Sequence, residues 1–333
     1  MARASAADYS QCHMPTRRPS FALLLVALGA ASAMACEPAV ELPAGAVAAA
    51  APADETAPEP APALSAGDAF LKRATEEVIE FLAAGADIVM PGPVEVLLLT
   101  SEQATERRRR YAESLGDEVG YTAAMDSMAD LMFSGNLLGR YFPDEEAVYV
   151  FEDAVFGRGA AAGSRDDERA LETLFPVLAH EMVHAYDHMV YGVVPAPDDF
   201  DTLLADPAEL PHIQALMSLL EGRATYASEL ACHAAGRRPL RARTVQEVLD
   251  SDFLEGDGSL GGGALASAGN MLIKLKLVQY AYGRTFAKRV HDFGGEAFFH
   301  EVFEHLPLGM DELEDFTLFL VRWAETKEAE MDG

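Results

Sequence analysis

The chain contains little cysteine, little tryptophan and little positive charge. Among its 333 residues are 3 cysteines, 1 tryptophan and 25 Lys plus Arg against 54 Asp plus Glu, a formal net charge of -29 at pH 7. A surface this acidic repels phosphate backbones, so we expect no nucleic-acid partner. Hydrophobic residues make up 50% of the chain, which is enough for a sizeable core.

Long apolar runs are scarce too, and the informative one lies near the N-terminus. Residues 21–35, FALLLVALGAASAMA, follow Arg17 and Arg18 and end in small residues. A basic start, a short apolar stretch and a small-residue exit indicate a signal peptide, because a membrane-spanning helix needs about 20 apolar residues. We therefore expect residues 1–35 to be a signal peptide and the protein to be exported, to the periplasm, the extracellular space or the cell envelope.

The residue that follows the signal peptide is Cys36. The sequence AMAC can be cut by ordinary signal peptidase, or it can be a lipobox whose Cys36 is acylated, although Ala33 stands where a lipobox prefers Leu. Residues 36–66 are nearly all Ala, Pro, Glu and other small residues, which bury too little apolar surface to become ordered. A disordered tether of this kind suits a lipid-anchored domain better than a Cys36–Cys232 disulfide does. We favour attachment to the membrane through Cys36.

The remaining residues, 67–333, are expected to form one α+β domain with few strands and many helices. Short apolar runs predict buried strands at 93–100 and 145–154, and the second of these could pair with an extended substrate. Apolar residues at helical spacing predict the helices. These are expected at 69–85, 101–116, 121–139, 167–191, 209–235, 243–250, 265–281, 283–292, 295–305 and 311–327.

The stretch VLAHEMVHAYDH, residues 177–188, contains the motif H-E-x-x-H. On a helix, His180 and His184 lie on one face about 6 Å apart along the axis, so both imidazoles can bind one ion. Glu181 is rotated by about 100° from His180 and cannot join them as a ligand. It can instead take a proton from a metal-activated water, which is the role of this glutamate in H-E-x-x-H peptidases.

Catalytic zinc needs a third protein ligand and one open position. His188 lies about 12 Å along the axis from His180, so we expect it to support the site rather than to bind the same ion. Glu221 is the better candidate, because it is an isolated carboxylate in the apolar run LMSLLEG and is costly to bury unless it is paired or bound to a metal. Gly222 beside it would let another helix approach closely. Asp187 could orient a ligating histidine, or it could be an ordinary solvated side chain.

The two stretches HEMVHAYDH and EGRATY together resemble the gluzincin metallopeptidases, in which H-E-x-x-H and a glutamate on a later helix hold zinc. They are similar, more narrowly, to a group of exported bacterial zinc proteases with an E-G-x-A second helix. The later stretch QYAYGRTFAKRVHDFGG is similar to that group's Y-x-x-G-x-x-F and G-G pattern, with Tyr280 and Gly283 at the matching positions. The chain departs from the group at His188, and at Glu296, where the group usually has Trp. No G-x-M-E-N stretch is present, which disfavours the aminopeptidase branch.

The resemblance implies a zincin-like fold, with a small sheet, an active-site helix and a helix that carries the third ligand. It implies Zn²⁺ bound by His180, His184 and Glu221, and hydrolysis of a peptide or protein substrate, most simply as an endopeptidase, with Glu181 as general base. Tyr280 is a candidate donor to the oxyanion. Other candidates for that donor are Tyr282, His291, His300 and His305.

Two further hypotheses stay open at this point. The chain could be a catalytically degenerate zincin-like lipoprotein that serves as a binding or structural module of the envelope. It could also be an exported helical binding protein without metal. Retention of Glu181 argues against the first, because a structural zinc site does not use that carboxylate, and the isolated Glu221 argues against the second. The sequence does not specify the substrate, the cleavage specificity or the oligomeric state.

Overall fold

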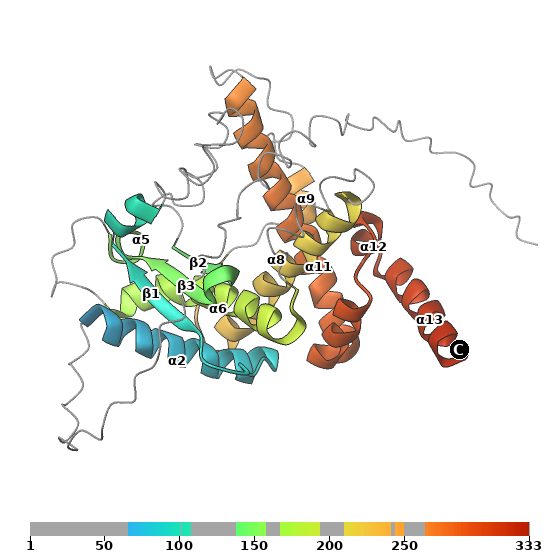
Figure 1. The fold of residues 1–333 in the computed structure, drawn as a ribbon, viewed down its shortest axis with the longest axis horizontal. Coiled ribbons are helices and arrows are strands. Elements are labelled where there is room, and N and C mark those ends of the chain that lie inside the picture. Colours follow the sequence, from blue (N-terminus) through green and yellow to red (C-terminus); the bar gives the residue numbers. More distant parts are fainter. Residues whose placement is uncertain are drawn as a thin grey trace, which may run out of the picture.

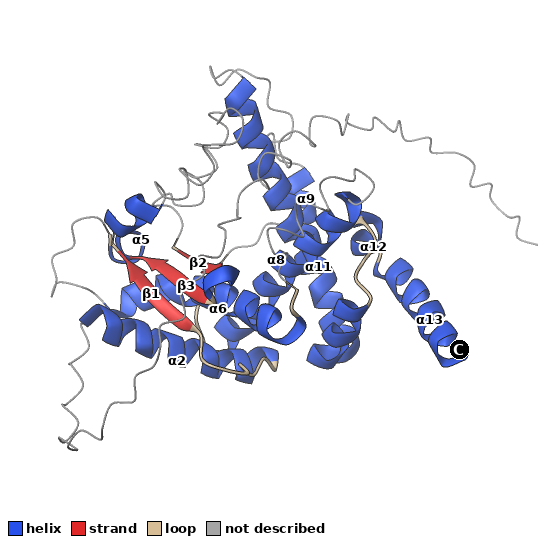
Figure 2. Ribbon diagram, in the orientation of Figure 1, coloured by secondary structure: helices blue, strands red, loops and turns tan. Residues whose placement is uncertain are grey.

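A computed structural model describes residues 66–100, 102–107, 138–157, 167–193, 210–240, 244–249 and 264–332. This part of the chain is mainly helical and has one small sheet, which confirms the α+β, mainly helical class (Figures 1 and 2). The predicted signal peptide, Cys36 and the tether up to residue 65 lie outside the described residues. Within the described ranges, no helix combines the length and the apolar character that crossing a membrane requires.

The sheet has three strands in the order β1-β3-β2, with β1 at Glu95–Leu99, β2 at Gly139–Phe142 and β3 at Ala147–Phe151. β3 pairs in parallel with β1 and antiparallel with β2. β1 and β3 confirm the two predicted strands. The expectation that the second of them could pair with a substrate is wrong, because β3 is the central strand and is paired on both sides. β2, which begins where a helix was expected to end, is an edge strand of the described sheet.

The fold has four long helices, α2 at Ala66–Ala86, α6 at Asp167–Tyr191, α8 at Leu210–Ala234 and α11 at Ala264–Glu304, of which α2 and α6 pack on the sheet. The bounds of α6 are those predicted from apolar spacing. α8 lies between the other three and packs against each of them. The shorter elements are η1 at Pro143–Glu145, α5 at Glu152–Phe156, α9 at Val245–Leu249, α12 at Met310–Glu314 and α13 at Phe316–Asp332.

α11 replaces three helices that the sequence predicts separately over 265–305. The chain stays helical through Gly283, and the non-helical backbone lies at Gly295, with φ 65° and ψ -156°. A positive φ is easily adopted only by glycine, so Gly295 forms the kink. Gly283 does not interrupt the helix, because its missing side chain is needed for close packing against α8.

The buried apolar residues form two main clusters that meet along α8. The first lies between α2, α6 and one face of the sheet, and it takes Ala224, Ala227 and Ala231 from the C-terminal half of α8. The second lies between α11, α12 and α13, and it takes Leu216 and Leu219 from the N-terminal half. Residues 221–223 of α8 therefore lie where the two cores join.

Candidate metal centre

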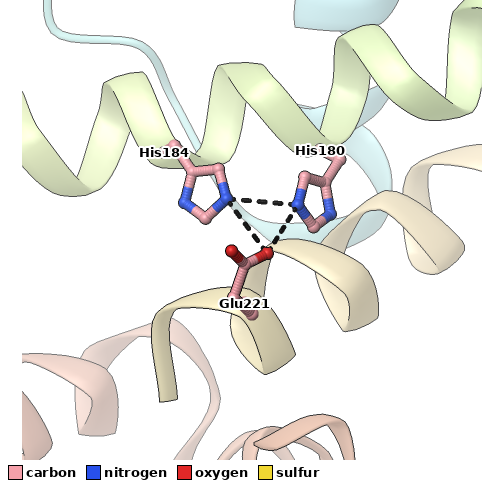
Figure 3. A group of neighbouring side chains, drawn as sticks. All are labelled: His180, His184 and Glu221. Atoms are coloured by element: carbon pink, nitrogen blue, oxygen red, sulfur yellow. Dashed lines mark hydrogen bonds and ion pairs between the residues drawn. The ribbon is translucent and has the colours of Figure 1, made fainter. Parts of the chain in front are cut away.

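His180 and His184 on α6 and Glu221 on α8 point toward one another (Figure 3). The two Nε2 atoms lie 3.1 Å apart, and Glu221 Oε2 is 3.3 Å from His180 Nε2 and 3.7 Å from His184 Nε2. The side chains of His180 and Glu221 are each 11% exposed, and that of His184 is 18% exposed. The three residues chosen from the sequence thus form one nearly buried group, which could hold a metal ion.

The donor atoms fit a small divalent cation in both kind and spacing. Two ligands of a tetrahedral zinc ion, with bonds of about 2.1 Å, lie about 3.4 Å apart. The separations in this group, 3.1, 3.3 and 3.7 Å, lie on both sides of that value. Two imidazole nitrogens and one carboxylate oxygen also suit transition metals such as zinc better than calcium or magnesium, which prefer oxygen ligands only.

The position of Glu221 depends on close contact between α8 and α11. A Cβ atom added to Gly222 would overlap the backbone of Gly283, and one added to Gly283 would overlap the backbone of Ser218. The expectation that Gly222 lets another helix approach is therefore confirmed, and Gly283 supplies the matching gap on α11. Because Glu221 adjoins Gly222, this contact holds the carboxylate against α6 on one side of α8 while α11 occupies the other.

Glu181 lies beside the metal group, and it contacts the edge strand. The backbone N–H of Tyr141 on β2 donates a hydrogen bond to Glu181 Oε2 at 2.8 Å. The phenol oxygen of the same tyrosine lies 2.7 Å from His188 Nδ1, and burial, followed by the charge of Glu146, raises the pKa of Tyr141 to about 12. Tyr141 therefore joins β2 to α6 at two points, and His188 contacts this tyrosine rather than the metal group.

Tyr280 on α11 reaches the group from a third helix. Its ring centroid is 5.9 Å from that of His180. Burial raises the pKa of the Tyr280 hydroxyl well above its ordinary value, and the charges of Glu221 and Glu181 and a hydrogen bond with Glu221 raise it further. The hydroxyl is therefore protonated at neutral pH and can donate a hydrogen bond to Glu221 beside the metal group.

Asp187 is not the solvated side chain that the sequence allows as one alternative. It is fully buried and forms an ion pair with Arg223 on α8. Arg223 and Tyr141 are the two residues of this region that sequence reasoning missed. Arg223, two residues after Glu221, carries the same signal in the sequence, an isolated charge in an apolar helix. Tyr141 has no comparable signal, because β2 itself was not predicted.

The other candidate donors on α11 lie elsewhere. His291 packs against Tyr226, and His300 packs against Tyr191. The pKa of Tyr282 is raised by burial and then by Glu314, which lies outside the metal group. A second set of possible ligands comprises Glu301, Glu304 and His305. Lys327 Nζ lies 3.0 Å from Glu301 and 3.7 Å from Glu304, so both carboxylates of this set already pair with an ammonium group.

Comparison with known proteins adds little to this geometry. A solved structure from Chloroflexus aurantiacus, described as a candidate hydrolase with a novel fold, is similar to this chain with a TM-score of 0.45 and 20% sequence identity, over 76% of this chain and 89% of that one. No protein-family model matches the chain. No curated protein matches it either. Its function must therefore be inferred from its own side chains.

Proposed function

We propose that this protein is a zinc-dependent peptidase of the gluzincin kind. The observation that carries the proposal is the convergence of His180, His184 and Glu221 on one point, with Glu181 beside them on the same helix. Zincins that hydrolyse peptides combine three protein ligands with an adjacent carboxylate. A purely structural zinc site is closed by four protein ligands, whereas three such side chains form the described group.

Zinc bound here would supply a Lewis acid that makes an attacking water acidic and polarises the substrate carbonyl. Glu181 follows His180 directly, and its carboxylate is fixed at the β2 edge by the N–H of Tyr141. In the proposed reaction Glu181 takes the proton of the attacking water and transfers it to the leaving amine. Burial of His180 and Glu221 limits the access of bulk water to this side of the site.

Tyr280 is the proposed donor to the oxygen that gains charge in the transition state. A donor of this kind must be neutral and must lie close to the metal group. The hydroxyl of Tyr280 meets both conditions, because a tyrosine is protonated at neutral pH and this one hydrogen bonds to Glu221. A bound carbonyl oxygen would take over this hydrogen bond as the reaction proceeds.

The substrate we propose is an extended peptide that pairs with β2. Phe151 N–H donates to Leu138 C=O, so alternation along the antiparallel pair turns the N–H and C=O of Tyr141 away from β3. The hydrogen bond from this N–H to Glu181 agrees with that direction. Because Glu181 takes the N–H of Tyr141, a peptide strand added at this edge would pair through the C=O of Tyr141 and the backbone of Gly139, with one of its carbonyl groups beside Glu181 and the metal group.

We also propose that the protein is exported and held at the envelope through acylated Cys36. The basis is the sequence of residues 17–66 alone. Substitution Cys36→Ser should release the mature protein from the membrane fraction, and intact-mass measurement of the wild type should show a diacylglyceryl or triacylated Cys36. A mature chain of unmodified mass that begins at Cys36 would contradict the anchor but not the export.

The peptidase mechanism is tested by Glu181→Gln, with Glu76→Gln on the exposed surface of α2 as the matched control. The Glu76 side chain is 67% exposed. We expect Glu181→Gln to keep zinc and to lower kcat on a peptide library by at least about 100-fold, as for loss of a general base. Glu76→Gln should behave as wild type. If Glu181→Gln keeps both zinc and full activity, the catalytic proposal is wrong and a degenerate zincin-like binding module is the better description.

A further inference from the structure

A cluster of buried charges lies beside the metal group and takes no part in the chemistry proposed above. Arg223 on α8 forms ion pairs with Asp187 on α6 and, at 2.5 Å, with Glu296 on α11. The Arg223 side chain is 1% exposed and that of Asp187 is 0% exposed. Buried ions are costly unless they are paired, so this cluster constrains the helices that carry it.

The ion pair joins the same two helices that the metal group joins. Asp187 lies three residues after His184 on α6, about 4.5 Å along the axis, and Arg223 lies two residues after Glu221 on α8, about 3 Å along it. The contact between α6 and α8 in this region is otherwise largely apolar. Apolar contacts are non-directional, whereas a guanidinium–carboxylate pair is directional and favours one register of the two helices.

Aromatic side chains enclose the guanidinium. The Cζ atom of Arg223 lies between 4.6 and 5.4 Å from the ring centroids of Tyr186, Tyr191, Phe299 and Phe303. The Tyr191 hydroxyl donates to Glu296 Oε1 at 3.0 Å, and Glu296 directly follows the kink at Gly295. Glu296 is therefore positioned by the kink at Gly295, and its ion pair with Arg223 connects α11 to α8 and α6.

We propose that Arg223 is a positioning residue for the metal centre. It fixes the register of α8 on α6, so that Glu221 stays within reach of His180 and His184. The inference rests on the proposed metal centre and extends it by assigning its support to Arg223, Asp187 and Glu296. Outer residues that orient metal ligands typically change metal affinity by about 10- to 100-fold when they are replaced.

The test compares Arg223→Met with Arg284→Met in the full chain. Arg284 on α11 is the matched control, because it forms a two-pronged ion pair with Glu229 on α8, with both N–O distances 2.7 Å. This pair also joins two helices and is partly buried, but it lies about 12 Å along α8 from Glu221. The metal is removed with a chelator, folding is checked by circular dichroism, and Zn²⁺ affinity is measured by competition with a chromogenic chelator.

We expect Arg223→Met to weaken Zn²⁺ binding by about 10- to 100-fold and Arg284→Met to change it by less than about 3-fold. Equal Zn²⁺ affinity of Arg223→Met and wild type, or an equal loss in Arg284→Met, would overturn the proposal. If Arg223→Met does not fold, Arg223→Lys and Asp187→Asn are measured by the same criteria. Zinc binding without peptidase activity in the wild type would refute the proposed reaction alone, whereas a wild type that binds no Zn²⁺ would refute both proposals.

Discussion

Gly222 on α8 and Gly283 on α11 lie backbone against backbone, with no room for a Cβ atom on either residue. Gly222 adjoins Glu221, and Gly283 lies one helical turn after Tyr280. The contact therefore sets the position of a proposed zinc ligand and of a proposed hydrogen-bond donor at once. It also explains why α11 is continuous at a glycine where the sequence alone predicts a break.

Replacement of either glycine should disturb both helices. We expect Gly222→Ala and Gly283→Ala each to lower the free energy of unfolding by about 1–3 kcal/mol, or more if the backbones cannot separate, because overpacked atoms must be accommodated. Urea denaturation of the metal-free protein measures this. Gly92→Ala is the control, since a Cβ there would meet only the Met189 methyl at 3.8 Å. If the urea midpoints of all three variants are equal, the contact between Gly222 and Gly283 is not tight.

His188 should be dispensable for metal binding although it carries the same spacing as the two ligands. Its Nδ1 contacts the Tyr141 hydroxyl at 2.7 Å, and it is not among the residues of the metal group. We expect His188→Ala to bind one zinc per chain with nearly normal affinity and to lose about 1 kcal/mol of stability with the hydrogen bond. His184→Ala should lose tight zinc binding. If metal analysis finds no zinc in His188→Ala, the assignment of Glu221 rather than His188 as the third ligand is wrong.

Tyr280→Phe should separate catalysis from metal binding. Removal of a single oxyanion donor typically lowers kcat by about 10²- to 10³-fold. Because Tyr280 is not a proposed ligand, zinc content should stay at the wild-type level and KM should change little. Steady-state kinetics on a cleaved peptide, with metal content measured on the same sample, test this. A rise in KM with unchanged kcat would place Tyr280 in substrate binding instead.

Cys232 should be unreactive in the folded protein. Its side chain is fully buried, and desolvation raises the pKa of the thiol to about 11. An unfolded thiol has a pKa of about 8.5, so the folded state holds this proton more tightly, and the resulting stability is present below about pH 8.5 and lost as the pH rises through about 11. In a Cys12→Ser, Cys36→Ser protein at pH 8, we expect labelling by a disulfide reagent to be at least about 100-fold slower than in guanidinium. Equal rates would show that Cys232 is accessible.

The site residues that the sequence predicts are those that recur at helical spacing or that carry a lone charge in an apolar stretch. Helical spacing gave the bounds of α6 and paired His180 with His184, and the cost of burying a lone carboxylate selected Glu221. The partner of Asp187 could not be predicted in this way, because Arg223 lies on another helix and the pairing depends on how α6 and α8 pack. The zinc reaction, the export and the lipid anchor stay predictions.

Short and packed elements were harder to predict. β2 has only four residues, so its alternation of buried and half-buried side chains is too brief to read as a strand. Gly283 stands at an expected helix boundary, because glycine disfavours a helix in isolation, and contact with Gly222 accounts for a glycine inside α11. Glu296 stands where the proteases that this chain resembles in sequence pattern usually have Trp, and its ion pair with Arg223 accounts for a carboxylate at this position.

The central claim is that one zinc ion is bound by two residues of α6 and one of α8. Anomalous X-ray diffraction at the zinc absorption edge, on crystals of protein purified without chelator, tests this most directly. We predict one peak within about 2.2 Å of His180 Nε2, His184 Nε2 and a Glu221 carboxylate oxygen. A zinc ion at full occupancy elsewhere in the protein, or one that does not contact Glu221, would contradict this claim.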